Sequence, residues 1–204
     1  MKLLFPHRAL DAIIFIAACA LSTVATAHTG IENHAHTSFL TGFIHPLLGL
    51  DHLAAMVAVG FWSALTARRA GPELLWGPLG FANLLLLGAM LGLQGVVLSA
   101  VEPMIAASLL VIGLLVVSRL RLPGLGAALM VGVFAIFHGL AHGQELVNSA
   151  SAFQTLAGML TATVLLHASG LGLGWALRSA NVWLPRIAGA AVVLFGGALL
   201  LQLA

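Results

Sequence analysis

Side chains that bind metals are concentrated in two short segments of an otherwise apolar chain. The segments are HPLLGLDH at 45–52 and FHGLAHGQE at 137–145, and their metal-binding side chains are His45, Asp51, His52, His138, His142 and Glu145. An ionisable side chain at the centre of a membrane helix costs about 2.5 to 3.5 kcal/mol on insertion scales, so such residues usually have a function or a partner. Imidazole nitrogen binds nickel, cobalt, copper and zinc, whereas magnesium and calcium prefer oxygen. The two segments therefore predict an intramembrane site for a divalent transition metal.

The second segment has the spacing of a single helix face. His138 and His142 are four residues apart, and Glu145 follows three residues later. Residues at these intervals lie one above another on an α-helix. We therefore expect all three side chains to face the same neighbouring element and to contribute to one metal site.

The first segment also returns its histidines to one face, because His45 and His52 are seven residues apart. Asp51 points elsewhere on an ideal helix and is better suited to orienting a neighbouring histidine than to binding the metal directly. Pro46 and Gly49 lie between the two histidines and could break the helix. In that case the argument from a single face fails.

The expected depths of the two histidine pairs agree. If the first helix runs inward and the fourth outward, a rise of about 1.5 Å per residue places His52 and His138 within roughly 5 Å of the membrane midplane. The same estimate places His45 and His142 about 10 Å nearer the outer surface. Two pairs at matching depths on oppositely directed helices predict a coordination site that opens outward.

Four further histidines have two interpretations each. His167 is expected near the middle of the fifth helix, where it is either another ligand or hydrogen-bonded to nearby backbone. The N-terminal segment carries His28, His34 and His36, which form either an outer metal-collecting site or ordinary surface positions. A terminal amine beside the His28 imidazole would chelate a metal if the mature chain began there.

The composition shows which surroundings position these residues. The 204 residues are 61% hydrophobic and 7% charged, against about 25% charged residues in ordinary soluble domains. Eight Lys and Arg stand against six Asp and Glu, which is too few for a nucleic-acid-binding patch. The lipid bilayer is therefore the expected partner, and nucleic acid is not.

The N-terminus has the features of a secretory signal. Lys2 and Arg8 precede an apolar run over 9–24, and the small residues at 25–27 suit a signal peptidase. Two alternatives are a lipoprotein-type cleavage before Cys19 and an uncleaved helix. Cys19 is the only cysteine, so cleavage after Ala27 leaves a chain without disulfides or thiolate ligands.

An all-α membrane protein is predicted, with a signal peptide at 1–27 and one transmembrane domain over 28–204. A span needs about 20 mostly apolar residues. Charged residues, Pro and Gly interrupt the apolar sequence at five places. These interruptions predict six transmembrane helices at about 38–66, 74–98, 102–118, 124–147, 153–177 and 183–203. Three spans in each half are compatible with a 3+3 inverted repeat, an arrangement that places a site near the midplane in many transporters.

The arginines predict the orientation. Every basic residue after the signal falls in the first, third or fifth predicted loop or at the edge of one, and these residues are Arg68, Arg69, Arg119, Arg121, Arg178 and Arg186. Cytoplasmic loops collect Lys and Arg. We therefore expect a multi-pass protein of the bacterial inner membrane whose mature N- and C-termini both face the periplasm.

The sequence resembles the HupE/UreJ family of nickel and cobalt permeases along its whole length. The segments that carry the resemblance are the start HTG at 28–30, HPLLGLDH with the following LAAMVAVG, and FHGLAHGQE. The resemblance implies a cleaved signal, six helices, and uptake of nickel or cobalt for enzymes such as hydrogenase or urease. By position, the six residues named first match the family's two motifs. Leu140 stands where many relatives carry a further histidine, which implies one ligand fewer here.

Together these observations predict a permease without enzymatic activity or a prosthetic group, in which nickel or cobalt is the transported substrate. Facilitated diffusion is sufficient, because an inside-negative potential favours entry by about 2.3 kcal/mol per charge per 100 mV. A homo-oligomer is compatible with the sequence. The alternative is an intramembrane zinc hydrolase that uses His138, His142 and Glu145, although Glu145 does not lie between the histidines as in HExxH.

Overall fold

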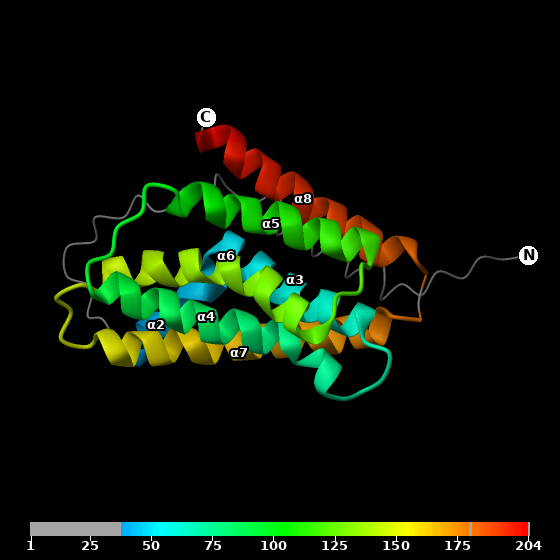
Figure 1. The fold of residues 1–204 in the computed structure, drawn as a ribbon, viewed down its shortest axis with the longest axis horizontal. Coiled ribbons are helices and arrows are strands. Elements are labelled where there is room, and N and C mark those ends of the chain that lie inside the picture. Colours follow the sequence, from blue (N-terminus) through cyan, green and yellow to red (C-terminus); the bar gives the residue numbers. More distant parts are fainter. Residues whose placement is uncertain (1–37, 180, 204) are drawn as a thin grey trace, which may run out of the picture. The chain divides into compact units, whose positions relative to one another are not determined.

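A computed structural model describes residues 38–179 and 181–203, all of whose regular structure is helical. The elements are α2 Phe39–Leu48, α3 Leu50–Thr66, the short 3-10 helix η1 Pro72–Leu74, α4 Trp76–Leu93, α5 Val101–Ser118, α6 Gly124–Glu145, α7 Ala152–Leu177 and α8 Trp183–Leu203 (Figure 1). The predicted all-α class is confirmed. The predicted signal peptide, with Cys19 and the N-terminal histidines, lies outside the described residues.

Five of these helices, α4 to α8, are long and apolar enough to cross a membrane. The pair formed by α2 and α3 meets the same criteria together but is bent by 81° at its break, so it adds a sixth span if it is counted as one. The chain is therefore a multi-pass membrane protein.

The bend lies at Gly49, between the two histidines of the first motif. Gly49 has an extended backbone, with φ −75° and ψ 107°, and its N–H donates to the carbonyl oxygen of His45 at 3.1 Å. Its own carbonyl accepts from Leu53 N at 2.9 Å and begins α3. The predicted continuous helix at 38–66 is thus two helices, because the chain leaves helical geometry three residues after Pro46.

The second helix is also shorter than the predicted 74–98. It begins at Trp76, after the η1 turn, and ends at Leu93. Gly95 has φ +82°, in the left-handed region that favours glycine, so the chain turns there. Hydropathy alone did not show this end, because the residues at 96–98 are apolar.

Glycines set the close approach of the helices that surround the metal-binding residues. A Cβ at Gly60 would collide with the backbone of His167 on α7, and one at Gly139 would collide with the backbone of Leu85 on α4. Small residues allow membrane helices to pack backbone against backbone. In this way α3 packs against α7, and α4 packs against α6.

The direction of each helix pair follows from these contacts. Gly80 and Gly88 on α4 approach Ala128 and Ile136 on α6, so the residue numbers rise together and the helices are parallel. The pair α3 and α7 is parallel for the same reason. By contrast, α5 and α8 are antiparallel, since Gly189 on α8 approaches Val116 of α5 while Gly196, later on α8, approaches the earlier Leu109.

A further contact joins the ends of the parallel pair α3 and α7. Arg178 donates from Nη2 to the carbonyl oxygens of Ala67, at 3.1 Å, and Arg68, at 3.4 Å. Its guanidinium carbon also lies 4.1 Å from the centroid of the Trp175 ring. A cation at a helix C-terminus additionally interacts favourably with the helix dipole.

The first prediction concerns this contact. Arg178→Ala should lower the stability of the purified protein by about 1 to 2 kcal/mol, because it removes a charge-assisted hydrogen bond and a cation–π contact. Denaturant unfolding in detergent measures the effect. The matched control is Arg69→Ala, since Arg69 is an exposed arginine that follows the same end of α3. Equal stability of the two variants would contradict the prediction.

Candidate metal site within the membrane

Three imidazoles from three helices converge at the bend. They belong to His45 near the end of α2, His52 in the first turn of α3 and His142 near the end of α6, and each offers a ring nitrogen within 4.8 Å of the others. Bonds of about 2.0 to 2.1 Å from nitrogen to a metal place two ligand atoms up to about 4 Å apart. Small side-chain adjustments would therefore bring this set onto one ion.

The bend explains why His45 and His52 meet. On a straight helix, seven residues would separate them by about 10 Å along the axis. In the structure their ring centroids are 5.6 Å apart, and the His142 ring lies 4.9 Å from His45 and 4.7 Å from His52. The break at Gly49 therefore converts two levels of one helix into a single cluster.

Asp51 is placed to orient His52. Its Oδ1 lies 2.9 Å from Nδ1 of His52. A carboxylate accepts the proton of this nitrogen, which leaves Nε2 of His52 as the lone-pair donor for a metal. A Cβ at Gly49 would lie 3.1 Å from both of these atoms, so glycine also leaves room for the Asp51–His52 pair.

His138 lies beside this cluster, one helical turn before His142. Its ring centroid is 5.1 Å from that of His52, and its Nε2 is 3.0 Å from Oγ of Ser108 on α5. The Ser108 hydroxyl donates its proton to the carbonyl of Ile105 at 2.6 Å. Since that proton is used, Ser108 accepts from Nε2–H of His138, and the lone pair of His138 is on Nδ1.

Glu145 lies at the outer end of the same face of α6. Its Oε2 is 3.8 Å from Nδ1 of His142, and its side chain is 43% exposed. This distance is longer than a hydrogen bond. Glu145 therefore adds negative charge at the rim of the cluster, while the imidazoles form its interior.

Among the described residues, exposure differs across this set of side chains. His52, His138 and His142 are each 1% exposed or less, whereas His45 is half-buried and Glu145 is exposed. Toward the other end of the helices, the space is filled by a core whose largest members include Trp62, Phe81, Met56, Leu85, Ile112 and Leu115. The more exposed members of this set therefore lie on one side of the buried imidazoles, and the apolar core lies on the other.

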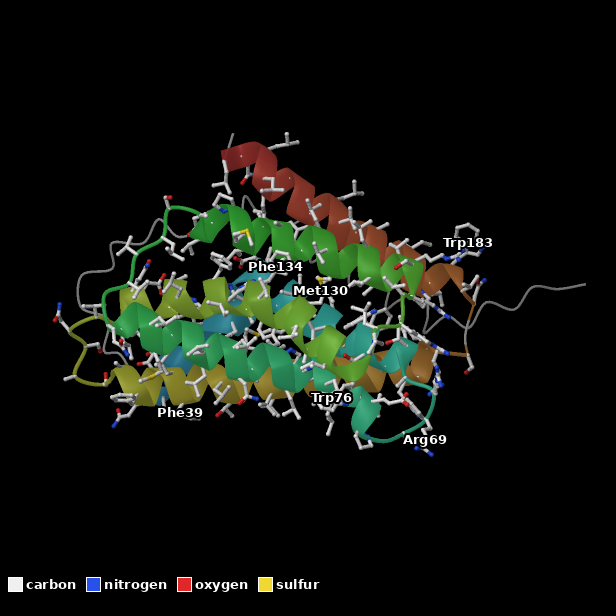
Figure 2. The ribbon with its side chains drawn as sticks, in the orientation of Figure 1. Phe39, Arg69, Trp76, Met130, Phe134 and Trp183 are labelled. Atoms are coloured by element: carbon white, nitrogen blue, oxygen red, sulfur yellow. The ribbon has the colours of Figure 1, made fainter. Side chains whose placement is uncertain are left out.

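A cavity no larger than about one water molecule lies within this apolar region. Its lining includes Ser108 of α5 and Phe81 of α4. Met130 and Phe134 of α6, labelled in Figure 2, also line it. The cavity is almost wholly apolar, with Ser108 as the one polar residue among the described residues that line it, so it is poorly suited to a hydrated cation.

The structure separates His167 from the cluster. His167 is buried on α7, and its ring centroid is 5.2 Å from that of Phe81. Phe81 in turn lies 5.7 Å from His138. Of the predicted site residues, His45, Asp51, His52, His138, His142 and Glu145 are thus brought together, and His167 is not. His28, His34 and His36 lie outside the described residues.

The sequence analysis missed Ser108 and Phe81. Ser108 is the only hydroxyl within the apolar part of its helix before the terminal Ser118, which is a weak signal for a buried hydrogen bond. Phe81 carried no signal, because an aromatic residue in an apolar helix is ordinary core. Only the packing of α4 against α6 and α7 places its ring between two imidazoles.

Comparison with known proteins agrees with this architecture. The family model described as HupE / UreJ protein matches residues 16–199. The chain is 44% identical over 188 residues to Protein HupE of Rhizobium leguminosarum bv. viciae, which covers 91% of this chain and 94% of that protein. No solved structure matches the chain. Since the match spans nearly the whole sequence, this chain belongs to the HupE/UreJ family.

Proposed function

We propose that this protein is a permease that moves a divalent transition metal, nickel or cobalt, into the cell as its substrate. The observation that carries the proposal is the convergence of His45, His52 and His142 from three helices within a membrane domain. Buried imidazoles at this separation suit borderline metals. Family membership supports the same assignment, because the HupE/UreJ resemblance implies nickel and cobalt uptake.

The proposed topology has six spans, with α2 and α3 together forming the first. Arg68 and Arg69 follow α3, and the other arginines follow α5 or α7 or begin α8, so all of them belong to one side of the membrane. Figure 2 places Arg69, Trp76 and Trp183 toward one end of the helices and Phe39 toward the other. The arginines at this end favour a cytoplasmic assignment for it, because cytoplasmic loops collect Lys and Arg. The exposed end of the histidine cluster then faces the periplasm of the inner membrane.

The helix pairing supports a 3+3 inverted repeat. The first span pairs with α7, the fifth span, and α4 pairs with α6, the second with the fourth. Exchange of the two three-span halves converts the first pair into the second. The same exchange leaves the pair of third and sixth spans, α5 and α8, unchanged. The set of helix pairs is therefore unchanged when the two halves are exchanged, as expected for a structure built from two repeats.

The chemistry of the cluster suits a transported ion. Neutral imidazoles replace part of the hydration shell of the metal, and the carboxylates of Asp51 and Glu145 offset part of its charge. A transported ion must also leave, so a few neutral ligands are more suitable than a closed cage of thiolates and carboxylates. The inside-negative potential then favours inward movement. We infer that the N-terminal histidines collect the ion first, and that enzymes such as hydrogenase or urease use it.

The alternative of an intramembrane zinc hydrolase gains no support. A hydrolytic zinc site needs a general base beside the metal-bound water. Glu145 lies 3.8 Å from His142 on the exposed rim, beyond the histidines rather than between them. The family match is to HupE/UreJ proteins. These observations favour transport over hydrolysis.

Metal flux into proteoliposomes tests the proposal directly. Vesicles that contain the purified protein and an internal metal-sensitive dye should take up Ni²⁺ or Co²⁺ at least about tenfold faster than protein-free vesicles when the interior is negative. Mg²⁺, which prefers oxygen ligands, should not enter faster. Equal rates with and without protein would refute unaided transport.

A further inference from the structure

Phe81 separates the histidine cluster from a second buried imidazole. The Phe81 side chain is 2% exposed, and its ring lies 5.7 Å from His138 on one side and 5.2 Å from His167 on another. Its contact with His167 is edge-on, with the ring planes at 70°. The Phe81 ring therefore contacts both His138, at the edge of the cluster, and the buried imidazole of His167.

His167 has its free nitrogen in the form that binds metals. The ring hydrogen-bonds to the backbone of Thr163, and Nε2 has no partner among the described residues. The bond therefore uses Nδ1, and a carbonyl acceptor requires the proton on that nitrogen. Metal-binding histidines usually donate one N–H to a carbonyl or carboxylate and bind with the other nitrogen. His167 has this arrangement while it is buried in apolar surroundings.

A second polar atom without a partner lies nearby. Ser63 is 4% exposed, and its Oγ has no hydrogen-bond partner among the described residues. Gly60, one turn earlier on α3, contacts the backbone of His167, and a Cβ at Gly77, one turn before Phe81, would lie 2.7 Å from Oγ of Ser63. The two atoms thus belong to the same α3–α4–α7 region, with Ser63 farther from the histidine cluster.

Such atoms are uncommon. Buried polar side chains are almost always hydrogen-bonded, and each exception in a native structure calls for an explanation. Outside the histidine cluster, the described residues place such atoms on Ser63, His167 and Arg119 only. Arg119 follows the end of α5, whereas His167 contacts Phe81 of α4 and Ser63 lies beside Gly77, one turn before Phe81.

We propose that His167 Nε2 is a ligand of a second, inner metal position, that the Phe81 ring is the barrier between this position and the histidine cluster, and that Ser63 Oγ is a polar contact farther along the same α3–α4–α7 region. The proposal rests on the proposed transport function. The ion at this position is a borderline divalent cation such as Ni²⁺ or Co²⁺, because a single imidazole suits such an ion and holds it weakly. Displacement of the Phe81 ring would connect His138 to His167 and let the ion advance by ligand exchange.

Separate measurements of binding and flux test the inner position. His167→Leu should leave equilibrium Ni²⁺ binding at the cluster within about twofold of wild type but lower flux into proteoliposomes by about tenfold or more, the size of loss usual for metal-site partners. Thr155→Val is the control, because Thr155 is a buried hydroxyl residue on the same helix, three turns from His167. Flux of His167→Leu equal to that of the control would overturn the proposal.

A spectroscopic test does not depend on the stability of the leucine variant. In a Cys19→Ser background, which removes the only cysteine, His167→Cys places a thiol at the proposed inner position. Added Co²⁺ should then produce a thiolate-to-cobalt charge-transfer absorption that the Cys19→Ser protein lacks. The absorption should strengthen when Phe81→Ala is added, because the barrier is removed. Absence of the band from the His167→Cys protein, both with and without Phe81→Ala, would show that the ion does not reach this position.

The outcomes separate this inference from the transport proposal. If wild-type vesicles take up neither Ni²⁺ nor Co²⁺, the proposed function fails. If wild-type vesicles take up metal, His52→Ala abolishes the uptake and His167→Leu leaves it unchanged, transport stands and the inner position fails. Loss of flux with retained binding in His167→Leu supports both.

Discussion

His52→Ala is expected to weaken metal binding at the cluster and to lower metal flux, each by about 100-fold or more, above the range for residues that only orient ligands. His52 is 1% exposed and is the one imidazole that contacts all three others, with ring centroids 5.6 Å from His45, 5.1 Å from His138 and 4.7 Å from His142. Removal of the His52 ring therefore takes away the imidazole that links His45 and His142 to His138. Isothermal titration with Ni²⁺ and flux into proteoliposomes measure the two effects.

The control must create a similar cavity without removing a ligand. Met56→Ala does so, because Met56 lies one turn after His52 on α3 and is also 1% exposed. Both variants should lose stability, by roughly 2 to 5 kcal/mol for the methionine. Only His52→Ala should lose binding. Equal metal affinity in the two variants would mean that the cluster does not hold the ion.

Much of this site was predictable, because helix periodicity and membrane depth are local properties of a sequence. The spacing of His138 and His142 gave one face, and counting from the helix ends paired His52 with His138 and His45 with His142. The structure places the rings of these pairs 5.1 Å and 4.9 Å apart. Residues that lie far apart in the chain were matched by depth alone.

What could not be predicted depends on how the helices pack. The 81° bend between α2 and α3 brings His45 within reach of His52, and Pro46 and Gly49 showed only that a break was allowed. The separation of His167 from the cluster depends on the position of Phe81, which follows from helix contacts at Gly60 and Gly139 rather than from local pattern. Periodicity gives the face of a helix, while small residues decide which helix it meets.

The role of Asp51 illustrates the same division. Its place beside His52 made an orienting role plausible from sequence, although a helix wheel points the two side chains in different directions. Both residues lie in the first turn of α3, immediately after the bend. There the carboxylate reaches Nδ1 of His52 at 2.9 Å. The bend therefore determines the position of the ligands and the hydrogen bond that orients one of them.

Asp51→Asn should consequently weaken Ni²⁺ binding by about 10- to 100-fold, with a parallel loss of flux at low metal concentration. The asparagine oxygen can still accept from Nδ1–H, so the ring orientation is retained, but the negative charge that makes Nε2 a stronger donor is lost. Glu145→Gln removes one negative charge from the same cluster and is the matched comparison. Because Glu145 is 43% exposed and 3.8 Å from His142, its charge is screened by solvent, and its loss should cost less.

Titration of both variants with Ni²⁺, together with the double variant, separates charge from orientation. If Asp51 acts through His52, combining Asp51→Asn with His52→Ala should add little to the loss from His52→Ala alone, because residues that act through one contact are not additive. If Asp51 binds the metal directly, the double variant should lose markedly more than either single variant. A larger loss in Glu145→Gln than in Asp51→Asn would instead place the ion at the exposed rim, outside the bend that brings the three imidazoles together.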